Sequence, residues 1–149
     1  MTDFLEIRVD KFIFRVAMDR FYNGEGVWAK DENGRVRIGL SDFSQQRSGD
    51  VAFAEIKPVG TMLTFDDEAA VIETIKVNLA LPSPVTGKVV EINPAMAATS
   101  EVINQDPYGD GWLALVEPAD WAADRSRLLD PQAYFTRIKK EAEEEARKR

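Results

Sequence analysis

The sequence predicts a mainly β protein of the α+β class, with short helices and a helical C-terminus, in a single domain over residues 1–149. Short segments rich in β-branched and aromatic residues, several with alternating polar and apolar side chains, recur as far as Val116. Turn-forming residues separate these segments, and Asn33-Gly34 is the clearest hairpin signal because both residue types tolerate positive φ. Towards the C-terminus the apolar residues follow helical spacing instead.

Strands are expected where apolar runs are bounded by glycine, proline, asparagine or aspartate. Arg35–Leu40 alternates polar and apolar residues, which is the pattern of a half-buried strand. In chain order, the expected strands are 11–18, 27–30, 35–40, 51–55, 62–63, 69–75, 77–81, 88–92 and 112–116.

Helices are expected where a capping residue precedes a helical pattern. Ser41-Asp42 is a helix start, and this short helix should end near Arg47. Asp130-Pro131 provides an N-cap followed by proline at the first helical position, and Tyr134, Phe135 and Ile138 form a stripe that can dock on the sheet. Residues 117–149 should form a helical C-terminal extension packed on the domain, with a frayed end because apolar residues become scarce after Lys140. Shorter helical segments are expected near 95–97, 100–104 and 118–121.

Composition excludes several classes of function. The chain has no histidine and no cysteine, so it lacks the side chains that do most proton shuttling and thiol chemistry near neutral pH. Its 19 basic and 26 acidic residues give a net charge of −7, which argues against binding to nucleic acid. No metal site is expected, because Asp66-Asp67-Glu68 lacks the ligand spacing of a calcium loop. Without a signal peptide or an apolar stretch of ~18 residues, a cytoplasmic protein with no membrane span is expected.

Lys76 falls where two expected strands meet, just before the segment that begins Leu81-Pro82. A lysine at the tip of a hairpin is held in a fixed place, where another enzyme can attach a cofactor to it. Such a protein would be a carrier and not an enzyme, since the cofactor does the chemistry and the chain presents it. Taken alone, however, one lysine between two strands indicates only a solvent-exposed side chain.

Lys76 lies within Glu73-Thr74-Ile75-Lys76-Val77, and the segment Ser83-Pro84-Val85-Thr86-Gly87-Lys88-Val89-Val90 follows it. These two segments together resemble the lipoylation site of glycine cleavage H proteins and other lipoyl domains. The resemblance implies a lipoyl/biotinyl-type hammerhead sheet sandwich, with lipoate attached covalently to Lys76. It also implies that Glu73 helps to define the turn for the lipoylating enzyme or for partners. The equally weighted alternative is that Glu73 is only a solvent-exposed residue of the strand. Biotin is disfavoured, because biotinyl domains have methionines on both sides of the lysine.

Further segments extend the resemblance to the H-protein family over residues 21–140. They are Arg37–Phe43, Ser48–Glu55 and Asn104–Trp112, and they occur in the order that the family has. Several independent motifs in one order identify the chain as similar to an H-protein-like lipoyl carrier.

Two departures from the family pattern point to a divergent branch. The histidine that usually precedes the tryptophan at the position of Trp28 is missing, and Val77-Asn78-Leu79 replaces the usual small residues after the lysine. Residues 4–12 and 41–55 look more like the lipoate-binding proteins of sulfur-oxidising prokaryotes, which work beside a heterodisulfide-reductase-like complex. This resemblance implies a carrier whose lipoyl-lysine shuttles sulfur-containing intermediates in dissimilatory sulfur oxidation.

Two alternatives remain open. One is the H protein of the glycine cleavage system, which carries an aminomethyl group between a decarboxylase, an aminomethyltransferase and a dihydrolipoyl dehydrogenase. The other is an unmodified binding module with a carrier fold. The implied partners are a lipoate–protein ligase or another lipoylation enzyme, together with either the heterodisulfide-reductase-like complex and a dihydrolipoyl dehydrogenase or the glycine cleavage enzymes.

Overall fold

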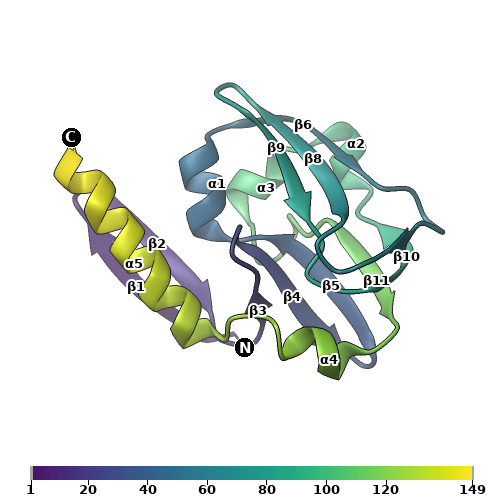
Figure 1. The fold of residues 1–149 in the computed structure, drawn as a ribbon. Coiled ribbons are helices and arrows are strands. Elements are labelled where there is room, and N and C mark those ends of the chain that lie inside the picture. The colour runs from purple at the N-terminus through teal and green to yellow at the C-terminus, as the bar shows by residue number, and fades with distance from the viewer. Residues whose placement is uncertain (1, 149) are drawn as a thin grey trace.

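The computed structural model describes residues 2–148 and confirms a mainly β fold with short helices and a C-terminal helix (Figure 1). The strands are β1 (Phe4–Val9), β2 (Phe12–Ala17), β3 (Phe21–Tyr22), β4 (Val27–Glu32), β5 (Arg35–Leu40), β6 (Val51–Ile56), β7 (Met62–Leu63), β8 (Glu68–Thr74), β9 (Asn78–Pro82), β10 (Gly87–Ile92) and β11 (Ala114–Pro118). The helices are α1 (Asp42–Ser48), α2 (Ala95–Ala98), α3 (Val102–Gln105), α4 (Trp121–Arg125) and α5 (Pro131–Lys148).

The strands form three antiparallel sheets. A six-stranded sheet has the order β3-β4-β5-β11-β10-β7, and a three-stranded sheet has the order β6-β8-β9. The remaining pair, β1-β2, is a separate hairpin that packs against α1 and α5. Figure 1 shows this hairpin and α5 together on one side of the molecule.

Each expected strand is present, and β1 and β3 were not expected. The side chains of β1 alternate in burial, but the strand ends at Asp10-Lys11, which is not a common hairpin pair. Asp10 makes the turn with a φ of 57°, a conformation that aspartate adopts more readily than most residues. The pairing of Phe4 with Ala17 and of Val9 with Phe12 therefore depends on a turn at Asp10-Lys11 that has no recognisable sequence signal. With only two residues, β3 is too short for a periodic pattern.

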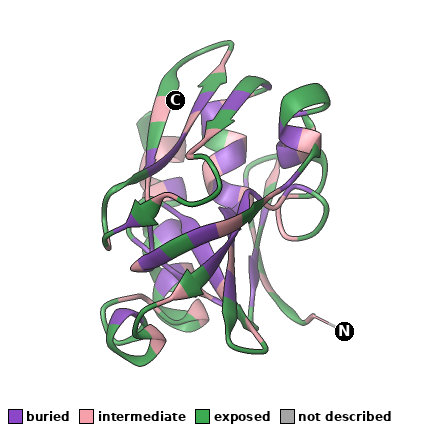
Figure 2. Cartoon of the chain, turned by 90° about the vertical axis from the view of Figure 1, so that its right-hand side faces the viewer, coloured by how far each residue is buried: buried purple, intermediate pink, exposed green. Residues whose placement is uncertain are grey.

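The larger hydrophobic core lies between the six-stranded and three-stranded sheets. Ile38 of β5, Ile72 of β8 and Leu81 of β9 are among its buried residues. Figure 2 shows that buried residues gather in the interior and exposed ones along loops and outer edges. Because β8 and β9 are anchored in this core, the turn that joins them projects from a rigid base.

The stripe on α5 docks only partly on the expected sheet. Tyr134 and Ile138 are buried, and α5 contacts β3, the edge strand of the six-stranded sheet, together with the β1-β2 hairpin. The ring of Tyr134 stacks on that of Tyr22 at a centroid distance of 4.3 Å. This second core also contains Phe14 and Phe43, so the hairpin, α1 and α5 form one packed unit.

Both longer helices begin at the expected capping residues. The hydroxyl of Ser41 accepts a hydrogen bond from the Ser44 amide at 3.2 Å, and the Asp130 carboxylate accepts one from the Ala133 amide at 2.8 Å. At the C-terminal side, β11 extends through Pro118, so the helical part begins at Trp121, and α5 continues through Lys148.

Candidate functional site

The turn between β8 and β9 presents Lys76 at the tip of the hairpin. The side-chain oxygen of Thr74 accepts hydrogen bonds from the amides of Lys76, at 3.1 Å, and Val77, at 3.0 Å. The Thr74 amide in turn donates to the Val77 carbonyl at 2.8 Å. A threonine that closes a turn in this way satisfies amides that would otherwise require a partner in water. None of residues 75–77 has a positive φ angle, so the β-branched Ile75 fits in the turn without backbone strain.

The hairpin tip is attached to the segment that follows α1. The Ile75 amide donates to the Asp50 carbonyl at 3.2 Å. Beside this bond, the aliphatic part of Lys76 lies along Gly49, where a Cβ atom would be 3.3 Å from Cε of the lysine. Gly49 ends α1 with φ 88° and ψ −169°, a conformation that is essentially restricted to glycine. The glycine therefore ends the helix and also makes room for the lysine.

Apolar side chains surround the exposed lysine. Ile75 is 76% exposed and Val77 is 45% exposed, although both are large and aliphatic. Phe53 of the neighbouring strand β6 is also exposed and pairs in register with Glu73. Apolar groups held in water around one reactive side chain are typical of a surface that another protein covers.

Glu73 lies at the exposed end of β8, opposite Phe53 in β6 and Asn78 in β9. Within residues 2–148 its carboxylate forms no hydrogen bond or ion pair. The hydrogen bonds of the turn are made by Thr74, so the carboxylate of Glu73 is open to a partner.

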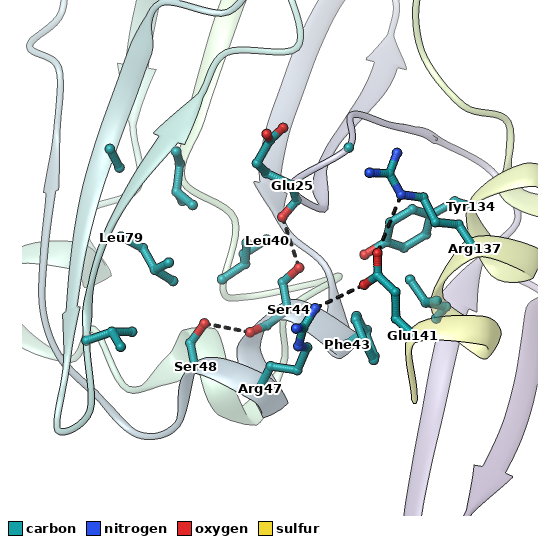
Figure 3. Close-up of a pocket in the computed structure, with 15 residues that line it drawn as sticks. Glu25, Leu40, Phe43, Ser44, Arg47, Ser48, Leu79, Tyr134, Arg137 and Glu141 are labelled. Carbon is teal, nitrogen blue, oxygen red and sulfur yellow. Dashed lines mark hydrogen bonds and ion pairs between the residues drawn. The ribbon is translucent and has the colours of Figure 1, made fainter. Parts of the chain in front are cut away.

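A large cleft opens beside the lysine turn (Figure 3). It measures about 410 Å³ and lies between α1, β9 and α5. Leu40, Phe43 and Leu79 form its apolar side. On the other side Glu141 accepts from Arg47 at 3.0 Å and lies 3.6 Å from Arg137. We call this the larger cleft.

A second cleft, of about 350 Å³, has Lys76 itself in its wall. Its other lining residues come from β2, α1 and α5, and they are Phe12, Phe14, Gln46, Arg47 and Glu145. We call this the hairpin cleft. Segments far apart in the sequence thus meet around the lysine.

Comparisons with known proteins match most of the chain. The family model described as glycine cleavage H-protein matches residues 20–141. The chain belongs to the glycine cleavage H-protein family. A glycine cleavage system H protein of Thermus thermophilus is 37% identical over 127 residues, covering 85% of this chain and 98% of that protein. One of Oceanobacillus iheyensis is 40% identical over 116 residues, covering 78% and 91%.

The fold agrees with a solved member of the H-protein family. The crystal structure of the glycine cleavage system H protein from Mycobacterium marinum superposes with a TM-score of 0.75 and 28% identity, covering 81% of this chain and 97% of that one. H proteins are carriers that typically bear lipoate and are not themselves enzymes, so the expected class of carrier is confirmed. The hairpin β1-β2 precedes the matched range. Among residues 2–148, no helix combines the length and apolar character that crossing a bilayer requires.

The residues around Lys76 fit the lipoyl group that H proteins typically carry. Lys76 is exposed, and its Nζ forms no hydrogen bond or ion pair within the described residues. An acyl group can therefore reach Nζ without breaking an existing interaction. The dithiolane of lipoate supplies redox-active sulfur, which a chain without cysteine lacks.

Sequence reasoning identified Lys76 but missed two residues that hold it. Thr74 was detectable, because threonine at the first position of a four-residue turn is a known turn former. Gly49 lies just past the helix end expected near Arg47, and its place under Lys76 depends on how α1 and the β8-β9 hairpin pack. The hairpin cleft has no local signal, since β2, α1 and α5 contribute to it from distant parts of the chain.

Proposed function

We propose that lipoate is attached through an amide bond to Nζ of Lys76, and that residues 1–149 act as one carrier domain that brings this arm to several enzymes. The observation that carries the proposal is the position of Lys76, exposed at the tip of the β8-β9 hairpin in a chain of the H-protein family. In the attachment reaction Nζ, deprotonated from ammonium to amine, attacks an activated lipoyl acyl carbon, the activating group leaves, and Nζ loses one further proton and keeps one as the amide N–H.

Attachment changes the physical character of the tip. The charged ammonium group becomes a neutral amide, so the tip enters a partner's active site without the cost of desolvating a charge. The exposed Ile75 and Val77 then provide apolar contact area around the root of the arm. Because the strands below the turn are fixed in the core, a docked carrier holds the arm at high effective concentration in the partner's site.

The glycine cleavage system is the partner system that the relatives favour. The similar proteins of Thermus thermophilus and Oceanobacillus iheyensis are named glycine cleavage system H proteins. On this assignment the arm carries an aminomethyl group between the decarboxylase, the aminomethyltransferase and the dihydrolipoyl dehydrogenase of that system.

Sulfur oxidation is the second candidate, and the surface of the arm's root favours it. Val77-Asn78-Leu79 stands where H proteins usually have small residues, and Val77 is 45% exposed beside the lysine. The chain also lacks the histidine usual before the tryptophan at position 28. A surface around Lys76 that differs in this way from that of H proteins would fit a different partner. That partner is a heterodisulfide-reductase-like complex that handles sulfur-containing groups on the arm.

Intact-mass spectrometry with peptide mapping tests the attachment. The protein is produced with lipoate and a lipoate–protein ligase, and in parallel with a general lipoylation system. We expect a lipoyl mass increment on the peptide that contains Lys76 and none in Lys76→Arg, which keeps the charge but cannot form the same amide. An unmodified Lys76 in both systems would exclude the carrier function and favour a binding module.

Reconstitution then separates the two partner systems. The lipoylated protein is offered to glycine cleavage enzymes, with glycine-dependent reduction of the arm as the readout, and to a heterodisulfide-reductase-like complex with a sulfur substrate. Turnover only in the first assay supports the glycine cleavage assignment. Turnover only in the second assay supports sulfur oxidation.

A further inference from the structure

The outer edge of β2, on the side away from β1, is closed by side chains from the rest of the molecule. Four hydrogen bonds close it: the Arg15 amide to Asp42 (2.9 Å), Gln46 to the Ile13 carbonyl (2.8 Å), Tyr108 to the Arg15 carbonyl (2.7 Å) and Tyr22 to the Ala17 carbonyl (2.7 Å). A strand edge covered in this way cannot pair with another strand.

The outer edge of β1 is open. The Asp3 carbonyl accepts a hydrogen bond from the Met18 amide at 2.9 Å, which fixes the alternation of the antiparallel ladder. Every second residue from Asp3 to Val9 therefore turns its backbone groups towards β2, and the residues between them turn theirs outwards. The outward residues are Phe4, Glu6 and Arg8. Within residues 2–148, no group from outside the hairpin bonds to their backbone.

The side chains along this open edge have charges that are complementary to a second copy of the same edge. Glu6 and Arg8 are exposed, on the face of β1 away from α5. The Arg8 guanidinium forms no ion pair with any residue that the structure describes. Glu6 binds Arg15 at 2.9 Å, but a carboxylate has acceptor sites for a second cation as well.

The charges select one register for such a pairing. Two antiparallel registers overlap most of β1 while the outward backbone groups face each other. The register centred on Ile7 sets Glu6 of each copy opposite Arg8 of the other, and Leu5 opposite Val9 on the α5 face. The register centred on Glu6 sets two glutamates directly opposite each other, which is destabilising. The first register is therefore favoured.

From these observations we propose that β1 pairs with β1 of a second copy of this chain, which gives a homodimer with a continuous sheet of order β2-β1-β1-β2. A second copy is the partner because the edge is complementary to itself, and a two-fold contact of this kind closes after two copies. The pairing does not depend on lipoylation, and the hairpin lies before the range matched by the family model. No residue of β1 lines the hairpin cleft that contains Lys76, so each dimer presents two lysine turns.

Single cysteines test the register, because the chain has no cysteine of its own. Ile7→Cys sets each thiol opposite its counterpart in a non-hydrogen-bonded pair, with Cα atoms about 4.5 Å apart, within the range of a disulfide. Leu5→Cys is the matched control, since Leu5 is half-buried on the same face but would lie about 14 Å from its counterpart. After thermal unfolding has shown that both variants are folded, mild oxidation should cross-link the first and not the second.

Charge reversal tests the pairing in solution. In sedimentation equilibrium, the mass of the wild-type protein should rise with concentration towards twice 16.7 kDa. Arg8→Glu sets glutamates opposite each other and should weaken dimerisation on the order of tenfold or more. Arg35→Glu should dimerise like the wild type, because Arg35 is an exposed arginine of β5 that also forms no ion pair in the described part of the chain.

Mixing two variants provides a rescue. Glu6→Arg should be weakened as Arg8→Glu is, because arginines then lie opposite each other. An equimolar mixture of the two variants should form a heterodimer, since each cross-strand pair then joins an arginine to a glutamate. In the wild-type protein, the backbone amides of Glu6 and Arg8 should exchange slowly with solvent at high protein concentration and rapidly at low concentration.

Four outcomes would overturn the proposal. They are a wild-type protein that stays monomeric at about 1 mM, a dimer that Arg8→Glu leaves unchanged, equal cross-linking of the two cysteine variants, and rapid exchange of the Glu6 and Arg8 amides at every concentration. Protection of these amides only after another protein is added would assign the open edge to a strand of that protein. Because every measurement uses protein without lipoate, a failure of the carrier function is recognised separately.

Discussion

Gly49 lies directly beneath the side chain of Lys76: a methyl group on the glycine would be 3.3 Å from Cε and 3.4 Å from Cδ of the lysine. The same glycine ends α1 with a φ of 88°. One residue therefore links the end of a helix to the position of the side chain that we propose to be modified.

Gly49→Ala should affect both stability and modification. The positive φ strains any residue with a Cβ, so we expect a loss of about 1–3 kcal/mol in the free energy of unfolding. The new methyl group should also displace Lys76 and slow its lipoylation. Denaturant unfolding and a timed mass-spectrometric lipoylation assay measure the two effects.

Gly60→Ala is the matched control for this change. Gly60 has a φ of 94°, and a Cβ there would meet no atom within 4 Å. It should lose similar stability but be lipoylated at the wild-type rate. If both variants are lipoylated equally slowly, strain alone and not the contact with Lys76 limits modification.

Thr74→Val should loosen the turn that presents Lys76. Valine has nearly the same shape but cannot accept the hydrogen bonds from the amides of Lys76 and Val77. Because the tip is exposed and water can replace these bonds, we expect a loss of about 1 kcal/mol in the free energy of unfolding. Amide hydrogen exchange at residues 75–77 should become faster, and lipoylation slower. Thr74→Ser keeps the acceptor and should restore slow exchange.

Glu73→Gln separates recognition from structure. The carboxylate of Glu73 forms no hydrogen bond or ion pair within residues 2–148, so the free energy of unfolding should change by less than about 0.5 kcal/mol. Lipoylation should nevertheless become slower. If Glu73 contacts the ligase, the slower rate should appear as a higher apparent KM of the ligase for this protein. An unchanged lipoylation rate would assign Glu73 to an ordinary exposed strand position.

Tyr134→Phe should weaken the attachment of α5. The hydroxyl groups of Tyr134 and Ser41 are 2.6 Å apart and buried, and burial raises the pKa of Tyr134 above its usual value, which keeps the phenol neutral. Removing one hydroxyl leaves the other without this partner, at a cost of about 1–3 kcal/mol. Hydrogen exchange in α5 should become faster, while exchange in β5 changes only with global stability. Equal acceleration in both elements would show that α5 has no separate opening reaction.

The Asp19 carboxylate should make stability depend on pH in acid. Burial raises its pKa, but the hydrogen bond from Arg20 at 2.7 Å and the positive charge of Arg20 lower the pKa by more than burial raises it. The pKa of Asp19 therefore lies below its usual value. A carboxyl group with a lower pKa in the folded state stabilises the fold above its unfolded pKa, about 3.9, and this contribution is lost as pH falls. Asp19→Asn should therefore lose less stability than the wild type between pH 5 and pH 3 in urea unfolding. Parallel curves for the two proteins would contradict this assignment.

The sequence predicted the strands of the two large sheets, except the two-residue β3, because each of them carries its own pattern. Arg35–Leu40 alternates in polarity, and Asn33-Gly34 supplies the two positive φ angles, 56° and 90°, of the turn before it. The β1 strand was not predicted, because it ends in a turn at Asp10 that lacks a common hairpin sequence. The docking surface predicted for α5 was incomplete for the same reason, since α5 packs on the unpredicted β1-β2 hairpin as well as on β3 of the six-stranded sheet.

By itself, the sequence determined the H-protein-like strand pattern, the exclusion of thiol and imidazole chemistry, and the choice of Lys76 at the junction of two strands. These properties depend on residues close together in the chain. Only the tertiary structure decided that Gly49 lies under the lysine and that Phe12, Arg47 and Glu145 line a cleft beside it. Those contacts join segments separated by tens of residues, and their positions depend on how α1, α5 and the β1-β2 hairpin pack together.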